Sequence, residues 1–352
     1  MDPSASGLDR PARPVPTMND IASKNAARPE ISLLVPSHGR PEDLANLVSA
    51  LEGQTLEPHR FELIVVDDGG DPPVSIDEGA LPFRTIVLRQ PNGGPAAARN
   101  AGLALCRAEL VLILNDDAIP APDLVESHLR AHAEVGDRTA VMGTFHFDEA
   151  SLESPFVRLL ENSPLLFNFP ALRHGERHDW TFFWTCNISL PTAALLEVGG
   201  FDEENFHKAI GEDVELGIRL QKRGYGVVYR EDCVAHHHHE LTPASYMRRA
   251  VDLGVHQLKI EGIHGIQGLA WSQDPAKRAR EKETLVGTLE TEREWAENVL
   301  AELEAFDTEY RGRPVPGELL EKLRADTQRA MCIFRLAGLH LGEHGVNPIE
   351  LL

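Results

Sequence analysis

The stretch Leu110-Val111-Leu112-Ile113-Leu114-Asn115-Asp116-Asp117-Ala118-Ile119-Pro120 decides the fold. Its five aliphatic residues, with no polar residue between them, predict a strand that is covered on both faces in the middle of an α/β sheet. Two adjacent carboxylates then stand at the carboxyl end of that strand, where open α/β sheets bind their ligands. Because carboxylates at the end of an apolar strand are costly to desolvate alone, the pair predicts a cation or a hydrogen-bond donor beside it.

The residues before this stretch alternate between strand and helix patterns. Strands are predicted over 31–36, 61–66 and 85–88, and a glycine-rich loop over 92–102 opens an alanine-rich helix. This order predicts a mainly parallel central sheet with right-handed crossovers and flanking helices. A second acid pair, Asp67-Asp68, follows the second strand, so two strands bring carboxylates to the same edge of the sheet.

Composition limits the class of protein and its partners. The chain has 352 residues, of which 42% are hydrophobic, enough for one large domain with an appendage. Its net charge of −21 argues against a nucleic-acid-binding surface, although a few arginines and a metal ion could still bind one nucleotide. The four cysteines form no CxxC pair, which indicates reduced thiols in a cytoplasmic protein.

The ends and the middle of the chain differ in pattern. Residues 1–29 lack the apolar core of a signal peptide and are predicted to be a disordered leader, and no apolar run reaches the ~20 residues of a membrane helix. Residues 139–185 look irregular and rich in aromatic side chains, which could line a sugar-stacking or acceptor cleft or form a second small core. Short strands over 227–229 and 233–235 then lead into four consecutive histidines, 236–239.

The composition becomes helical and highly charged after Thr242-Pro243, a helix N-cap signal. We therefore predict a main domain over 30–242 and a helical extension over 243–352 that contains an αα-hairpin. This hairpin could pack on the main domain or on another subunit, and a homodimer through the extension is one expectation.

The motifs in their order resemble those of family 2 glycosyltransferases of the GT-A fold. The resemblance covers roughly 30–250 and rests on five segments, which are Val65–Gly69, Ala98–Gly102, Asn115–Asp117, Gly199–Glu203 and Gly211–Leu216. It implies a GT-A-type, Rossmann-like sheet, and the transfer of a sugar from a nucleotide-diphosphate sugar to a hydroxyl group of a glycan or other acceptor.

The resemblance also implies a nucleotide-binding set. Asp68 takes the place of the residue that reads the nucleobase, although it could instead stabilise the turn before Gly69. His38 could stack on the base or be an ordinary loop residue, and Arg99 could pair with a nearby acid on a helix surface. The whole expected nucleotide-binding set is Pro36, Ser37, His38, Arg40, Asp68, Arg99 and Asp116.

A divalent cation, Mn²⁺ or Mg²⁺, is implied beside this set. Asn115-Asp116-Asp117 replaces the family's Asp-x-Asp motif, and Asp117 is the expected metal-binding acid. Asn115 removes one charge and puts the metal affinity in question. The resemblance implies His236 as the histidine ligand, and His238 points to the same side if the strand continues, although a histidine tract can also bind metals adventitiously.

Asp213 matches the family's catalytic base, and Glu212 is expected to position it. Without the resemblance, both acids could simply favour the positive end of a helix. The absence of a Gln-x-x-Arg-Trp motif and of a membrane helix favours a non-processive transferase, and the resemblance implies an inverting one. Uridine is the default nucleotide, with deoxythymidine or guanosine as alternatives. Two other functions stay open: a sugar nucleotidyltransferase, and an inactive module that binds a nucleotide-sugar or a metal.

Overall fold

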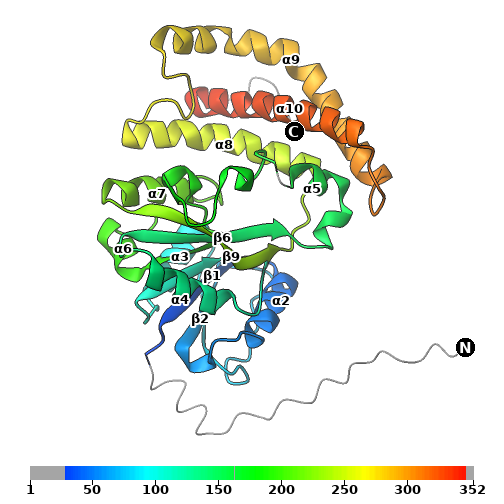
Figure 1. Ribbon diagram of the computed structural model, residues 1–352. Coiled ribbons are helices and arrows are strands. Elements are labelled where there is room, and N and C mark those ends of the chain that lie inside the picture. The colour runs from blue at the N-terminus through cyan, green and yellow to red at the C-terminus, as the bar shows by residue number, and fades with distance from the viewer. Residues whose placement is uncertain (1–27, 162, 346–352) are drawn as a thin grey trace, which may run out of the picture.

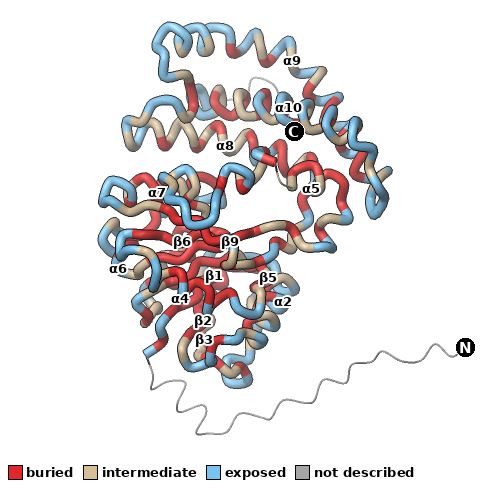
Figure 2. The backbone as a smooth tube through the Cα atoms, viewed as in Figure 1, coloured by how far each residue is buried: buried red, intermediate tan, exposed pale blue. Residues whose placement is uncertain are grey.

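The computed structural model describes residues 28–161 and 163–345, so most of the predicted leader, residues 1–27, lies outside the described part. An α/β domain built on one sheet carries a layer of long helices on one side (Figure 1). The strands of the sheet are buried, whereas the outermost helix is largely exposed (Figure 2). The predicted α/β class with a helical extension is confirmed.

The sheet has nine strands, ordered β3-β2-β1-β4-β8-β6-β9-β5, with β7 paired to β9. The pairs β3-β2, β2-β1 and β1-β4 are parallel, as are β6 and β9, while β8 runs antiparallel to both of its neighbours. The strands span Ile31–Ser37 (β1), Phe61–Asp67 (β2), Arg84–Arg89 (β3), Leu110–Leu114 (β4), Ala118–Pro120 (β5), Thr139–Phe147 (β6), Arg177–His178 (β7), Asn187–Pro191 (β8) and Gly226–His237 (β9).

The sheet follows from its sequence. Strands β1, β2 and β4 are almost completely buried along their length, as their continuous apolar runs predict. The flanking helices turn their leucine and alanine faces toward these strands. The helices of the α/β domain span Pro41–Glu52 (α2), Pro95–Leu103 (α3), Leu124–Glu134 (α4), Pro155–Leu160 (α5), Thr192–Val198 (α6) and Glu212–Lys222 (α7).

Two expectations about strands are wrong. The segment 139–185, expected to be irregular, begins with the nine-residue strand β6, and the two short strands expected over 227–235 are one strand, β9. Gly143 interrupts the apolar pattern of β6 because a Cβ there would overlap the Asn187 side chain and the Cys233 carbonyl oxygen. The glycine thus permits a close approach within the sheet rather than a loop.

The helical layer consists of α8 (Pro243–His264), α9 (Pro275–Glu309) and α10 (Gly317–His344). Thr242 caps α8 as expected, in a capping box with Ser245. Helices α8 and α10 cross closely, since a Cβ at Gly338 would overlap the carbonyl oxygen of Val251. The expected hairpin of α9 and α10 thus packs onto α8, which lies between it and the sheet (Figure 1).

The helical layer shares a hydrophobic core with part of the α/β domain. Phe156 and Leu160 of α5 are buried in the same cluster as Leu289 and Phe334 of the last two helices. Asp307 of α9 fixes this contact by accepting hydrogen bonds from the Ser154 hydroxyl and the Phe156 amide. The extension therefore packs on the main domain of its own chain. In the part of the chain that the structure describes, no helix has the length and apolarity of a membrane span.

Candidate active site

A cavity of about 380 Å³, the main cavity, lies where the carboxyl ends of β1, β2 and β4 meet the start of α7 and the end of β9. The sheet topology brings these ends together, as the sequence predicts for strands that end in acids. Ten of the twelve expected site residues line the main cavity, and they are Pro36, Ser37, His38, Arg40, Asp68, Arg99, Asp116, Asp117, Glu212 and Asp213.

Asp116 and Asp117 are both buried in the turn between β4 and β5, but their environments differ. The Ser37 hydroxyl donates to Asp116 Oδ2 (2.8 Å), and Arg40 Nη1 donates to Asp117 Oδ2 (2.7 Å). Burial and the neighbouring charge of Asp117 raise the pKa of Asp116 to about 6. Burial opposes ionisation of Asp117 too, but hydrogen bonds from His237 and His239 and the charge of Arg40 hold its pKa far below its usual range.

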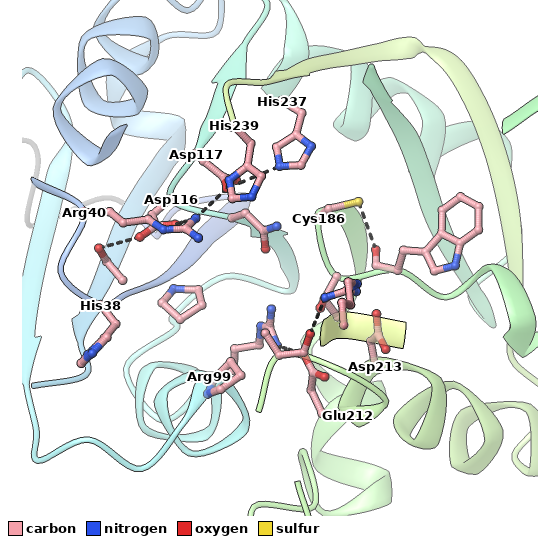
Figure 3. Close-up of a pocket in the computed structure, with 18 of the residues that line it drawn as sticks. His38, Arg40, Arg99, Asp116, Asp117, Cys186, Glu212, Asp213, His237 and His239 are labelled. Carbon is pink, nitrogen blue, oxygen red and sulfur yellow. Dashed lines mark hydrogen bonds and ion pairs between the residues drawn. The ribbon is translucent and has the colours of Figure 1, made fainter. Parts of the chain in front are cut away.

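Two histidines at the end of β9 face Asp117. His237 Nε2 lies 3.4 Å and His239 Nδ1 lies 3.2 Å from Asp117 Oδ2 (Figure 3). The His237 ring stacks against Phe145 and Phe147, with centroids 4.5 and 4.8 Å away. Burial lowers the pKa of His237, so its ring favours the neutral state in which imidazole binds metals.

The structure does not bring the expected histidine ligands, His236 and His238, together with Asp117. Strand β9 buries Cys233, Ala235 and His237 on one face, so His236 points to the other face and is exposed. His238 Nδ1 instead bonds Asp148 Oδ2 at 2.7 Å. Neither residue lines the main cavity.

Asp117, His237 and His239 could hold a divalent cation. Their candidate ligand atoms lie within 4.8 Å of one another. Asp117 Oδ1 is buried and has no hydrogen-bond partner among the described residues, which leaves a ligand atom available. One carboxylate with two imidazoles suits a transition-metal ion such as Mn²⁺ better than Mg²⁺, which prefers oxygen ligands.

Asp68 is held by the glycine loop that follows β3. Its carboxylate accepts hydrogen bonds from Gln90 Nε2 (2.8 Å), the Gly93 amide (2.9 Å) and the Gly94 amide (2.8 Å). His38 Nδ1 donates to the Asp68 carbonyl oxygen at 2.8 Å. Asp68 therefore shapes the loop in front of α3, whereas the turn after β2 is held by Asp67, which accepts hydrogen bonds from the Gly70 and Val74 amides. Reading of a nucleobase stays a prediction for Asp68.

The start of α7 forms the wall opposite Asp117 (Figure 3). Arg99 Nη1 donates to Glu212 Oε1 (2.8 Å), and both side chains are almost completely buried, so this ion pair joins α3 to α7. The half-buried carboxylate of Asp213 accepts the amide hydrogen of Val214 (2.7 Å). Burial and the adjacent charge of Glu212 raise the pKa of Asp213 to about 7, the range of an effective general base.

Sequence reasoning missed several residues of the main cavity. His237 and His239 were detectable, because Cys233 and Ala235 already set a two-residue alternation that continues into the histidine tract. Arg249 of α8 lines the cavity as well, and no local motif marks it. It lies one helical turn before Leu253, on a face that only packing against the α/β domain defines.

Residues 32–198 match the family model of glycosyl transferase family 2, the family that the sequence motifs resemble. A validoxylamine A glucosyltransferase of Streptomyces hygroscopicus subsp. limoneus is 30% identical over 258 residues, covering 62% of this chain and 57% of that protein. A pre-mycofactocin glycosyltransferase of Mycobacterium tuberculosis (strain CDC 1551 / Oshkosh) is 29% identical over 239 residues, covering 64% and 46%. The chain thus spans about half the length of these curated relatives.

A solved structure shares the fold. It is the mannosyltransferase PcManGT from Pyrobaculum calidifontis, in complex with GDP-Man and Mn²⁺, which superposes with a TM-score of 0.50 and covers 88% of each chain at 16% identity. Together with the sheet order, this similarity confirms the expected GT-A-type architecture.

Proposed function

Residues 32–198 of this chain match the glycosyl transferase family 2 model, and from that match we propose that the chain is a metal-dependent, inverting glycosyltransferase. It transfers one sugar at a time from a nucleotide-diphosphate sugar to an acceptor hydroxyl. The names of its relatives support glycosyl transfer, and the GDP-Man and Mn²⁺ bound to the structural neighbour agree with this type of donor and metal.

One observation carries the proposal: two different carboxylate centres face each other in the main cavity. One is Asp117 with His237 and His239, which together fit a cation. The other is Asp213, whose pKa is raised to about 7. Among the described residues, no Lys, Arg or His lies within salt-bridge distance of its carboxylate. An inverting transfer needs both, a charge to stabilise the leaving group and a base to deprotonate the acceptor.

The metal side binds the donor. Asp117, His237 and His239 would hold the cation, which would supply positive charge to the diphosphate of the donor. Arg40, which pairs with Asp117 Oδ2, adds a second positive charge at the same place. Asp116 is fixed by Ser37 at the carboxyl end of β1, and we assign it to the ribose of the donor.

The base side delivers the acceptor. Asp213 takes the proton of the acceptor hydroxyl as its oxygen forms a bond to the anomeric carbon from the face opposite the diphosphate. The bond between that carbon and the diphosphate oxygen breaks, and the nucleoside diphosphate leaves with the electron pair. Asp213 ends protonated, and the configuration at the anomeric carbon is inverted. Glu212 takes no proton in this step, because it is paired with Arg99 and positions the start of α7.

Nucleotide release tests the proposal. Purified full-length chain is incubated with UDP-glucose, UDP-N-acetylglucosamine, GDP-mannose and dTDP-glucose in turn, with Mn²⁺, Mg²⁺ or a chelator. We expect release of a nucleoside diphosphate from at least one donor with Mn²⁺ and its loss with the chelator. Release that is equal in the presence of chelator would refute metal dependence, and release of pyrophosphate from a nucleoside triphosphate would favour a nucleotidyltransferase.

A further inference from the structure

A second cavity of about 280 Å³, the side cavity, adjoins the main cavity between α7 and the helical layer. Both cavities are lined by Phe167, Trp184, Asp213 and Arg249. A molecule in the side cavity therefore lies next to the carboxylate that we assign as the base. The side cavity also receives residues of α8 and α10, which the family motifs do not include.

The walls of the side cavity are mostly hydrocarbon. Aliphatic side chains enter it from α7, from α8, from α10 and from the loops before α7 and after α8. Its main members from these elements are Ile210, Val214, Leu253, Ile260, Leu269 and Met331, and the rings of Phe167, Trp180 and Trp184 also line the cavity. Such walls stabilise a ligand through its apolar area rather than through hydrogen bonds.

Several polar groups around the side cavity are already engaged. The Tyr246 hydroxyl donates to the Leu165 carbonyl (2.6 Å), and His256 Nδ1 donates to the Asp252 carbonyl (2.7 Å). Gln257 Oε1 accepts from Arg335 (2.9 Å). A sugar carries a hydroxyl on nearly every ring carbon, and each hydroxyl buried without a partner is costly. The charged side chains of Asp213 and Arg249 line both cavities, which suits a hydroxyl near Asp213.

We propose that the side cavity binds the acceptor, and that the acceptor is a small alcohol or phenol with an apolar body rather than a glycan. This inference rests on the proposed function and names its acceptor class. The hydroxyl meets Asp213 while the apolar body packs against Leu253 and Met331. The cavity size, at the lower end for small-molecule sites, fits one or two rings better than an oligosaccharide. The helical layer thus selects the acceptor.

An acceptor panel tests the chemical class. The donor that works best above is supplied with Mn²⁺ and with 2-naphthol, cyclohexanemethanol, glucose or maltose, and nucleotide release is compared with the rate in water alone. We expect the two apolar acceptors to exceed the two sugars in kcat/KM by about tenfold or more, the scale of discrimination by an apolar pocket. Sugars that equal or exceed the apolar acceptors would overturn the inference.

Paired variants test the location. L253Q places an amide in the side cavity, whereas L258Q makes the same change at a half-buried leucine of α8 that packs in the helical core and lines neither cavity. M331Q and L336Q form the same pair on α10. We expect L253Q and M331Q to raise KM for the apolar acceptor by about tenfold, with KM near the unmodified value in L258Q and L336Q. Equal KM values within each pair would overturn the assignment.

The outcome separates this inference from the proposed function. Binding of UDP and of GDP in the presence of Mn²⁺ is measured by calorimetry on each variant. Nucleotide binding and release with no difference within the variant pairs would overturn the acceptor assignment alone. If no donor released a nucleotide and neither UDP nor GDP bound with Mn²⁺, the proposed function would fail and the acceptor inference with it.

Discussion

The main cavity and the side cavity meet at Asp213, but the first has a charged lining and the second a mostly apolar one. The main cavity is made of strand ends and carries buried charges, among them Asp117 and the Arg99–Glu212 pair. The side cavity is made of helix faces and is walled by aliphatic side chains such as Leu253. The difference indicates a division of labour in which the sheet binds and activates the donor while the added helices choose the acceptor.

The largest expected effect comes from replacing Asp213, which lines both cavities. D213N preserves the size of the side chain but removes the proton acceptor, so we expect the transfer rate to fall by about 10²–10⁴-fold. UDP or GDP binding with Mn²⁺ should persist, because the metal side is intact. E204Q, which neutralises an exposed acid outside both cavities, is the control. Full transfer by D213N would show that the base is another residue.

The next effect tests how strongly the main cavity depends on buried charge. R99M leaves Glu212 buried and without its cation, so we expect a loss of about 3–5 kcal/mol in the free energy of unfolding. The measurement is urea denaturation followed by circular dichroism. R293M removes an exposed pair with Glu297 and should cost at most about 0.5 kcal/mol. Similar losses in both variants would mean that the Arg99–Glu212 pair is not a structural tie.

A third test asks which histidines of β9 bind the metal. H237A should weaken Mn²⁺ affinity and Mn²⁺-dependent transfer by about 10–100-fold. Even residues that only hydrogen-bond a metal's ligands have effects of this size on metal affinity. H236A, one residue away on the opposite face of β9, should leave both values unchanged. Titration with Mn²⁺ under electron paramagnetic resonance measures the affinity directly. Loss in H236A with none in H237A would restore the ligand set expected from the sequence.

The smallest effect is a pH dependence. Asp213 must be ionised to accept a proton, and its raised pKa of about 7 places that ionisation near neutrality. We therefore expect kcat/KM to rise with pH up to about 7 and to fall about tenfold per pH unit below it. Glu212 raises this pKa, whereas Arg99 and Arg249 lower it, so R249Q should move the inflection to higher pH. A flat profile around neutral pH would contradict the assignment.

The contrast between the cavities also explains what the sequence could predict. Strong local patterns mark three acids: an apolar strand precedes Asp68 and Asp117, and a helix starts beside Asp213. The order of these elements in the sheet therefore predicted that the three acids meet at one site. The expected histidines, His236 and His238, followed the family resemblance, whereas the alternation of Cys233 and Ala235 along β9 places His237 on the buried face. The side cavity could not be predicted from the sequence, because Val214, Leu253 and Met331 meet only through packing between helices.

The central claim is that Asp117, His237 and His239 hold a divalent cation opposite Asp213. The most direct measurement is a crystal structure with Mn²⁺ and UDP or GDP, with data collected at the manganese absorption edge. The account predicts an anomalous peak within bonding distance of all three side chains and of the diphosphate. A peak on His236 or His238, or bound nucleotide with no metal beside Asp117, would contradict it.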